Sequence, residues 1–317
     1  MKKVKLTRFR YSIAFTVLEV LVSILVLTIL LSLLLVGVQS ARESARQVQC
    51  QNNLRQMILS LNLAINRRNT IPGMFAKSVV SKSQGDSSVF GNPFVVMAEE
   101  MSIPLTAKRG RIRLDSNGSG ESFPPSVFTC PTSGIRLGYR LNFGLTPIWF
   151  PRVTAPLRLF SQRLNTELRI SEVSDGLSYT VALAERMPND TRSFPRTIID
   201  TDQASSFDQM ERYCNLTSGV ILNFRGEWWG QSIEDCGYEH TRTPNAKEID
   251  CVCILSPMTR NTQVRFSIAA RSEHSGGVNI ATFDGSVKWI ASSITLNTWQ
   301  ALGTHQGHEI LDSNGVE

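Results

Sequence analysis

The sequence predicts an α+β protein in which a long N-terminal helix precedes a mainly antiparallel β globular head with short helices. Three observations indicate this fold class. An apolar run covers residues 13–38, a helical pattern without Pro or Gly continues through residues 39–68, and short β-type segments separated by turn residues follow from residue 69. A chain of 317 residues is long enough to bury a sizeable core.

The net charge of +6 originates at the N-terminus. Of the 33 basic residues, five precede residue 13, which leaves 28 against 27 acidic residues; the five are Lys2, Lys3, Lys5, Arg8 and Arg10. These charges therefore flank an apolar segment and do not form a phosphate-binding surface. We expect no nucleic-acid partner.

The apolar run is long enough to span a bilayer as a helix, which takes about 20 residues. Basic residues before it favour a cytoplasmic N-terminus and an outward-facing remainder. A cleaved signal peptide is the alternative, but its apolar region would be about 7–15 residues long and would end in small residues. We expect a retained single pass through the cytoplasmic membrane, with the head in the periplasm or at the cell surface.

One acid, Glu19, interrupts this run. A carboxylate at the centre of a bilayer costs about 2.5–3.5 kcal/mol on insertion scales. Either Glu19 lies near the end of the span and reaches the interface, or it has a partner cation.

The surrounding text, AFTVLEVLVSI, resembles the processing site of type IV prepilins and type II secretion pseudopilins, although Ala14 stands where Gly is usual. The resemblance implies a leader of residues 1–14, cleavage between Ala14 and Phe15 by a prepilin peptidase, and N-methylation of Phe15. Glu19 would then meet the Phe15 amine of a neighbouring subunit, either a like copy or another pseudopilin. Residues 15–38 would form the transmembrane half of the helix.

Residues 39–68 are expected to form the amphipathic, extracytoplasmic half of the same helix. Apolar residues recur there at helical spacing and should pack against the head: Ala41, Ala45, Val48, Leu54, Ile58, Leu61 and Ile65. NRRNTIPG at 66–73 should end the helix.

Within the head, residues 69–317, GNPFVVMAEEM predicts a short helix capped by Asn92, and TLNTWQALGT predicts another near the C-terminus. SVFTCP, GYRLNFG and SGVILNF predict short strands. The clearest hairpin spans residues 274–290, with a two-residue turn at Asp284 and Gly285.

Several blocks resemble a large bacterial family of undefined function that joins a prepilin-type N-terminus to a His-x9-Asp-Gly motif (domain of unknown function 1559, also labelled solute-binding). Here the motif is His274 with Asp284 and Gly285. The other matching blocks are ARESARQVQCQNNLRQ, the pair Cys130-Pro131, and a stretch from Asp175 and Gly176 to Glu185 in which Tyr179 replaces the usual Asn. We identify no residues that require a solute.

His274 and Asp284 have two interpretations. They can form a metal or catalytic pair, but a strand between them would hold them about 20–30 Å apart. The preferred interpretation is structural, with Asp284 in the turn and His274 at the strand entry. No nucleophile elbow, phosphate loop or dinucleotide fingerprint is present in the sequence. We predict a protein without catalytic residues, cofactor or metal.

Six cysteines follow the apolar run, in a compartment where disulfides persist. We expect Cys50 to pair with Cys130 and tie the helix to the head. Cys251 and Cys253 should pair outward, with Cys214 and Cys236. The alternative is a zinc site formed by Cys236, His240, Cys251 and Cys253.

These observations favour a bitopic, prepilin-like envelope protein that serves as a pseudopilin-type assembly subunit. The alternative is a membrane-tethered module that binds a solute or an envelope glycan through exposed aromatics such as Trp228 and Trp229. A hydrolase has no positive support in the sequence.

Overall fold

The computed structural model confirms the α+β fold class and describes two compact units, Met1–Ala45 and Arg46–Glu317. Its described residues are 16–73, 76–79, 88–103, 106–108, 111–113, 126–132, 137–145, 168–187, 196–200, 220–221, 236–255 and 263–307. Helix α1, Val17–Arg68, begins in the first unit and ends in the second, close to the predicted limits.

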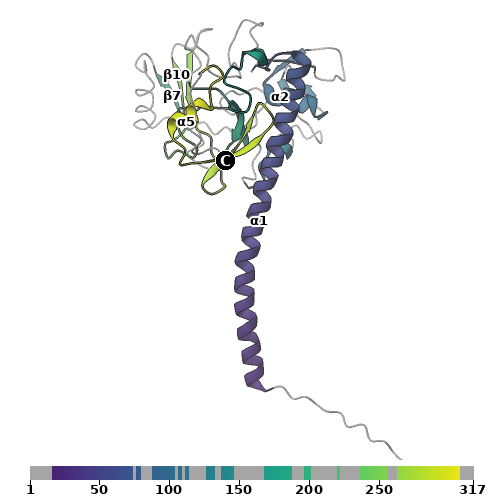
Figure 1. The fold of residues 1–317 in the computed structure, drawn as a ribbon, viewed down its shortest axis with the longest axis vertical. Coiled ribbons are helices and arrows are strands. Elements are labelled where there is room, and N and C mark those ends of the chain that lie inside the picture. The colour runs from purple at the N-terminus through teal and green to yellow at the C-terminus, as the bar shows by residue number, and fades with distance from the viewer. Residues whose placement is uncertain are drawn as a thin grey trace, which may run out of the picture. The chain divides into compact units, whose positions relative to one another are not determined.

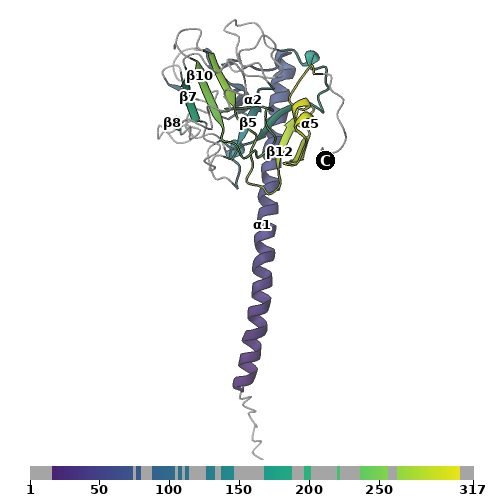
Figure 2. The same ribbon diagram turned by 90° about the vertical axis from the view of Figure 1, so that its left-hand side faces the viewer.

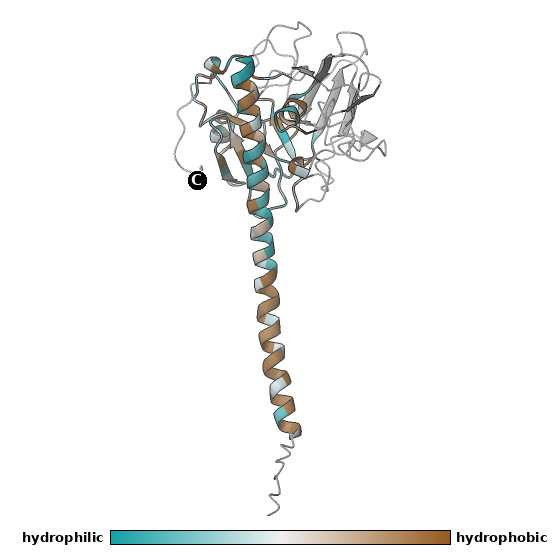
Figure 3. Ribbon diagram, turned by 90° about the vertical axis from the view of Figure 1, so that its right-hand side faces the viewer, coloured by the Kyte–Doolittle hydropathy of each residue, from teal (hydrophilic) through white to brown (hydrophobic). Residues whose placement is uncertain are grey.

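In the first unit, α1 exposes its apolar side chains on every face from Val17 to Val38. Figure 3 shows this stretch in the colour of hydrophobic residues. Among the described residues, α1 is the one helix that is long and apolar enough to cross a membrane. Length and composition support the predicted span, and its orientation and compartment remain predictions.

In the second unit, the C-terminal part of α1 buries one face in the core. The buried stripe begins at Cys50 and continues through Leu54, Met57, Ile58, Leu61, Ala64 and Ile65. The prediction that Val48 belongs to this stripe was wrong, because Val48 is 54% exposed. Ala41 and Ala45 belong to the first unit, and their packing stays a prediction. Helical periodicity identifies a face but not how far along the helix a partner covers it. The predicted stop is confirmed: α1 ends at Arg68 and Asn69 has a φ of 57°.

A five-stranded sheet forms the centre of the second unit, with strand order β13-β12-β6-β5-β9. All neighbours pair antiparallel except β5 and β9. Figure 2 labels two of its strands, β5 and β12. The bounds are β5 Tyr139–Asn142, β6 Val181–Glu185, β9 Gly237–Tyr238, β12 Gly277–Thr282 and β13 Val287–Ala291.

Alternation along these strands separates two apolar clusters. Leu141, Leu183 and Ala281 pack with α1 and with Phe94 of helix α2, Pro93–Glu100. Ala184, Val278 and Ile280 instead pack with Trp299 of helix α5, Leu296–Ala301. The sheet therefore has α1 on one face and α5 on the other.

A second, four-stranded sheet has the order β11-β10-β7-β8, with β10 and β7 parallel (Figure 1). Its strands are β7 Arg196–Asp200, β8 Val220–Ile221, β10 Cys251–Leu255 and β11 Gln263–Ser267. Two short hairpins complete the strands: β1 Ala76–Val79 with β2 Ser88–Gly91, and β3 Thr106–Lys108 with β4 Arg111–Arg113.

Several predicted elements are confirmed, and two needed correction. Asn92 caps α2, and Thr295 caps α5. SVFTCP is not a strand, because residues 126–128 form the 3-10 helix η1, Ser126–Phe128; a second 3-10 helix, η2, spans Ile170–Glu172. A three-residue apolar segment is too short for its period to distinguish strand from helix.

The 274–290 hairpin is present as β12 and β13, but its turn is longer than two residues. The Thr282 backbone N–H donates to the Ser286 carbonyl at 3.0 Å, and the Gly285 N–H donates to the Thr282 carbonyl at 3.0 Å. Gly285 has a φ of 92°, as in a three-residue loop that ends in a left-handed glycine. Asp-Gly thus correctly predicted a turn, but not its length.

Candidate functional site

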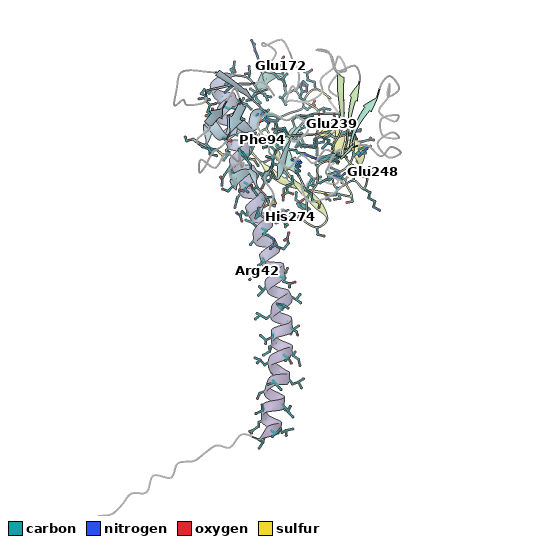
Figure 4. The ribbon with its side chains drawn as sticks, turned by 180° about the vertical axis from the view of Figure 1, so that it is seen from behind. Arg42, Phe94, Glu172, Glu239, Glu248 and His274 are labelled. Atoms are coloured by element: carbon teal, nitrogen blue, oxygen red, sulfur yellow. A yellow bond between two sulfur atoms is a disulfide. The ribbon has the colours of Figure 1, made fainter. Side chains whose placement is uncertain are left out.

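A buried polar centre lies on the α1 side of the five-stranded sheet. Glu185 ends β6 and shares the face of Leu183, while Asn279 shares the face of Ala281 on β12. His274 precedes β12 (Figure 4). Glu185 is 1% exposed, His274 4% and Asn279 0%, so these polar groups must satisfy one another.

Hydrogen bonds fix the Glu185 carboxylate. The Asn279 backbone N–H donates to Oε2 at 2.8 Å, and the Asn279 side-chain amide donates to Oε1 at 2.9 Å. His274 Nε2 lies 3.6 Å from Oε1. Burial raises the pKa of Glu185, while the Asn279 donors and His274 oppose the rise. The centre therefore holds a carboxyl group whose proton affinity exceeds that of an exposed glutamate.

The predicted Cys50–Cys130 disulfide borders this centre and is confirmed. It joins α1 to the segment after η1, with 5.4 Å between the two Cα atoms. His274 Nε2 lies 4.0 Å from Cys130 Sγ. The Tyr139 hydroxyl of β5 donates to the Cys50 carbonyl at 3.3 Å. The imidazole thus lies between a carboxylate and a disulfide sulfur.

Amide side chains of α1 attach the helix to the same region. Gln51 Nε2 donates to Asn279 Oδ1 at 3.0 Å, and Asn53 Nδ2 donates to the Thr129 carbonyl at 3.1 Å. The stretch QCQNN therefore supplies the disulfide sulfur and two amide contacts within a single turn of α1. Sequence reasoning recognised this block but did not assign these contacts.

Glu185 was also missed as the partner of His274, which was compared with Asp284 instead. The available signal was the acid that ends the apolar run VALAE, because a carboxylate in a buried strand needs a partner. Its partners come from β12, so only strand pairing reveals them.

Asp284 serves the hairpin turn at the other end of β12 from His274. Its Oδ1 accepts from the Thr282 hydroxyl at 2.5 Å and from the Ser286 N–H at 2.9 Å. Burial works against the charged form, but hydrogen bonds from Thr282, Ser286 and Ser178 outweigh it and lower the pKa of Asp284 to about 2. This arrangement matches the structural interpretation of the motif.

Asp175 and Gly176 form a second turn, before β6. Asp175 Oδ2 accepts from the Thr304 hydroxyl at 2.9 Å and from the Gly307 N–H at 2.8 Å. Gly176 has a φ of 93°, a conformation that disfavours side chains. This turn fastens the segment after α5 to the start of β6.

Glu19 lies in the first turn of α1 and forms a capping box with Thr16. Its Oε2 accepts from the Thr16 N–H at 2.9 Å and from the Thr16 hydroxyl at 3.0 Å, and the Glu19 N–H donates to that hydroxyl at 3.3 Å. The Thr-x-x-Glu spacing was a signal for this box that sequence reasoning overlooked. Ala14 and Phe15, the predicted cleavage residues, lie outside the described residues.

Of the four cysteines in the other predicted disulfides, the structure describes the side chain of Cys236 alone. Cys236 is buried, and its sulfur accepts from Asn92 Nδ2 at 2.8 Å. Cys214, the side chains of Cys251 and Cys253, and the Trp228-Trp229 pair lie outside the described part of the chain. Their predicted disulfides and the predicted aromatic binding surface stay predictions.

His240, the histidine of the alternative zinc site, uses both ring nitrogens in hydrogen bonds. Nδ1 lies 2.6 Å from the Trp299 carbonyl, and Nε2 lies 2.9 Å from the Tyr238 hydroxyl. Burial lowers the pKa of His240 to about 3, so the ring is neutral. This arrangement leaves neither nitrogen to a metal.

A buried ion cluster links the two sheets. Asp250, directly before β10, accepts from Arg140 of β5 and from Arg271, each at 3.0 Å. The Ala269 N–H adds a third donor at 3.1 Å. Burial, followed by repulsion from Arg186, lowers the pKa of Arg140 to about 10, while Asp250 opposes the decrease. The arrangement is typical of a structural cluster, because no side chain in it reaches the surface.

Comparison with known proteins yields one family. The model of a family described as protein of unknown function (DUF1559) matches residues 39–73 and 109–297. No curated protein and no solved structure matches the chain. The matched ranges include α1 from residue 39, the disulfide, the buried centre and both turns.

Proposed function

This chain belongs to the family of proteins of unknown function (DUF1559), and from the exposed apolar start of its helix α1 we propose a membrane-anchored envelope protein that acts as a pseudopilin-type assembly subunit. The role is structural and does not involve catalysis. The buried His274 and Glu185 support this view, because neither is open to a substrate.

The exposure of residues 17–38 carries the proposal. A helix from the core of a soluble domain would bury at least one face, whereas this stretch buries none. Transfer of apolar surface out of water lowers the free energy of the protein by about 25 cal/mol per Å². Lipid, or the apolar helices of other subunits within lipid, is the environment that such a surface requires.

The Cys50–Cys130 disulfide supports an extracytoplasmic position for the second unit. Disulfides persist in oxidising compartments and are rare in the cytosol. Basic residues before the apolar stretch favour the same orientation, since they retain the N-terminus in the cytoplasm.

Glu19 supports the assembly role. The capping box already directs its carboxylate toward the start of α1. Cleavage after Ala14 would create a charged amine at Phe15, next to Thr16. An amine from a neighbouring copy would then neutralise a carboxylate that is costly in lipid.

Mass spectrometry of the mature protein tests the processing step. We expect the chain purified from membranes of a host with a prepilin peptidase to begin at N-methylated Phe15. The same chain from a host lacking the peptidase should begin at Met1. An unprocessed Met1 terminus in both hosts would falsify cleavage, and with it the amine partner of Glu19, while leaving the membrane anchor standing.

Replacing Glu19 with Gln tests the pairing. The change keeps the shape of the side chain but removes its charge, so we expect two differently tagged copies to lose most of their co-purification from detergent. Glu43→Gln, on the same helix beyond the apolar stretch, is the matched control and should co-purify like the wild type. Equal recovery of the Glu19→Gln and wild-type pairs would contradict the assembly role.

A further inference from the structure

The buried centre brings four metal-ligating side chains together. One donor atom from each of Cys50, Cys130, Glu185 and His274 lies within 4.8 Å of the other three. All four residues are at least 95% buried, with exposures of 0%, 5%, 1% and 4%. They come from α1, the segment after η1, the end of β6 and the entry to β12, so the tertiary fold assembles them.

We propose that Cys50, Cys130, His274 and Glu185 bind one Zn²⁺ when the two cysteines are thiols, so that zinc and the disulfide are alternative cross-links at the same place. Both cysteines are thiols when the chain is synthesised, so zinc binding needs no reductant at that stage. Binding displaces the two thiol protons and forms two zinc–sulfur bonds. Later exchange with a second disulfide, supplied by a dithiol oxidant, transfers the two electrons of the thiolates to that disulfide. The oxidant leaves as two thiols, the Cys50–Cys130 bond forms and the ion is released.

The distances suit a tetrahedral ion. With zinc–sulfur bonds of about 2.3 Å and zinc–nitrogen or zinc–oxygen bonds of about 2.0–2.1 Å, a tetrahedral site separates nitrogen from sulfur by about 3.6 Å and nitrogen from oxygen by about 3.4 Å. His274 Nε2 lies 4.0 Å from Cys130 Sγ and 3.6 Å from Glu185 Oε1. Shifts of a few tenths of an ångström would bring both distances to the tetrahedral values.

The sulfurs can also reach tetrahedral positions. Once they are no longer bonded to each other, each rotates about its own Cα–Cβ bond. With 5.4 Å between the two Cα atoms, the thiolate sulfurs can therefore move apart to the separation that a tetrahedral site requires. A thiolate pair buried beside a carboxylate needs a cation, and Zn²⁺ prefers the combination of thiolate, imidazole and carboxylate.

The groups around the four ligands support ligation. Asn279 holds both oxygens of Glu185 and is itself held by Gln51, which neighbours Cys50 in α1. The Ser272 hydroxyl accepts from the His274 backbone N–H at 3.1 Å, which fixes the main chain from which the imidazole projects. Such outer contacts orient metal ligands and raise affinity.

Titration with Co²⁺, a spectroscopic substitute for Zn²⁺, tests the site. Full-length protein in detergent is reduced with a phosphine, and the phosphine is then removed under anaerobic conditions. The reduced protein is titrated with Co²⁺. We expect the reduced wild type to bind one more equivalent than the Cys50→Ser/Cys130→Ser variant, with tetrahedral ligand-field and sulfur-to-cobalt charge-transfer bands. Excess Zn²⁺ should abolish these bands, whereas Mg²⁺ should not.

Three further variants make the test specific. His274→Gln should lose the additional equivalent, and Asn279→Ala should lower the affinity about 10–100-fold through the outer contacts. Cys251→Ser/Cys253→Ser is the matched control for the other cysteines and should retain the equivalent. If the cobalt spectrum or stoichiometry is the same with and without Cys50, Cys130 and His274, the proposal is overturned.

Thermal unfolding distinguishes a missing metal site from a fold that is lost on reduction. Zn²⁺ should raise the melting temperature of the reduced wild type and leave that of the oxidised wild type and of Cys50→Ser/Cys130→Ser unchanged. A reduced wild type that Zn²⁺ neither stabilises nor refolds would refute the site. These outcomes are independent of membrane processing and of assembly through Glu19.

Discussion

Replacing Asp250 with Ala should lower the free energy of unfolding of the second unit by about 3–5 kcal/mol, because the change leaves buried cations without their counter-charge. Arg140 and Arg271 both donate to this carboxylate at 3.0 Å, and both are at most 1% exposed. Because Arg140 belongs to β5 and Asp250 directly precedes β10, the loss should separate the two sheets as well as destabilise each.

Thermal unfolding followed by circular dichroism, with the disulfide intact, measures this effect. Glu248→Ala is the matched control, since its side chain is exposed two residues away, and it should unfold like the wild type. A melting temperature of Asp250→Ala within error of that control would show that the cluster contributes little to stability.

The second large effect is expected for Cys50→Ser/Cys130→Ser measured with a metal chelator present. The disulfide closes a loop with a sequence separation of 80, for which the chain-entropy model gives a stabilisation of about 4–5 kcal/mol. Removing it also leaves His274 and Glu185 next to two hydroxyl groups. We expect a marked fall in the melting temperature of the second unit.

Chemical reduction of the wild type supplies the comparison for this variant. With a chelator present, a phosphine reductant should lower the wild-type melting temperature at least as far as the double substitution does. Equal melting temperatures of the variant and the untreated wild type would mean that non-covalent contacts alone hold α1 to the segment after η1.

The elements that sequence reasoning placed correctly are those whose signals are local. Asn92 caps α2, the stretch TLNTWQALGT contains α5, and the Asp-Gly pair at residues 284–285 lies in a hairpin turn. Each depends on backbone preferences within a few residues, which a single sequence displays directly. The limits of α1 were predictable for the same reason.

The partners within the buried centre were not predictable in this way. Glu185 and Asn279 are far apart in the chain and meet only because β6 and β12 pair in a particular register. Likewise, the exposure of Val48 depends on where along α1 the core begins to cover the helix, which periodicity does not reveal. The Cys50–Cys130 pair was predicted correctly on the expectation that a cross-link ties the helix to the head, but any of the five later cysteines could meet that expectation, and only the tertiary fold selects Cys130.

The contacts that hold α1 to the sheet also determine how the molecule carries mechanical load. Gln51 and Asn53 lie within one turn of Cys50 and donate hydrogen bonds to Asn279 and to the Thr129 carbonyl. Sliding the helix along its axis would therefore strain the disulfide and both hydrogen bonds simultaneously. Tension applied along α1 would therefore be resisted first at its contacts with β12 and Thr129, because the buried residues from Leu54 onward follow these contacts along the helix. The fold thus places its covalent link and two amide hydrogen bonds where the buried face of α1 begins.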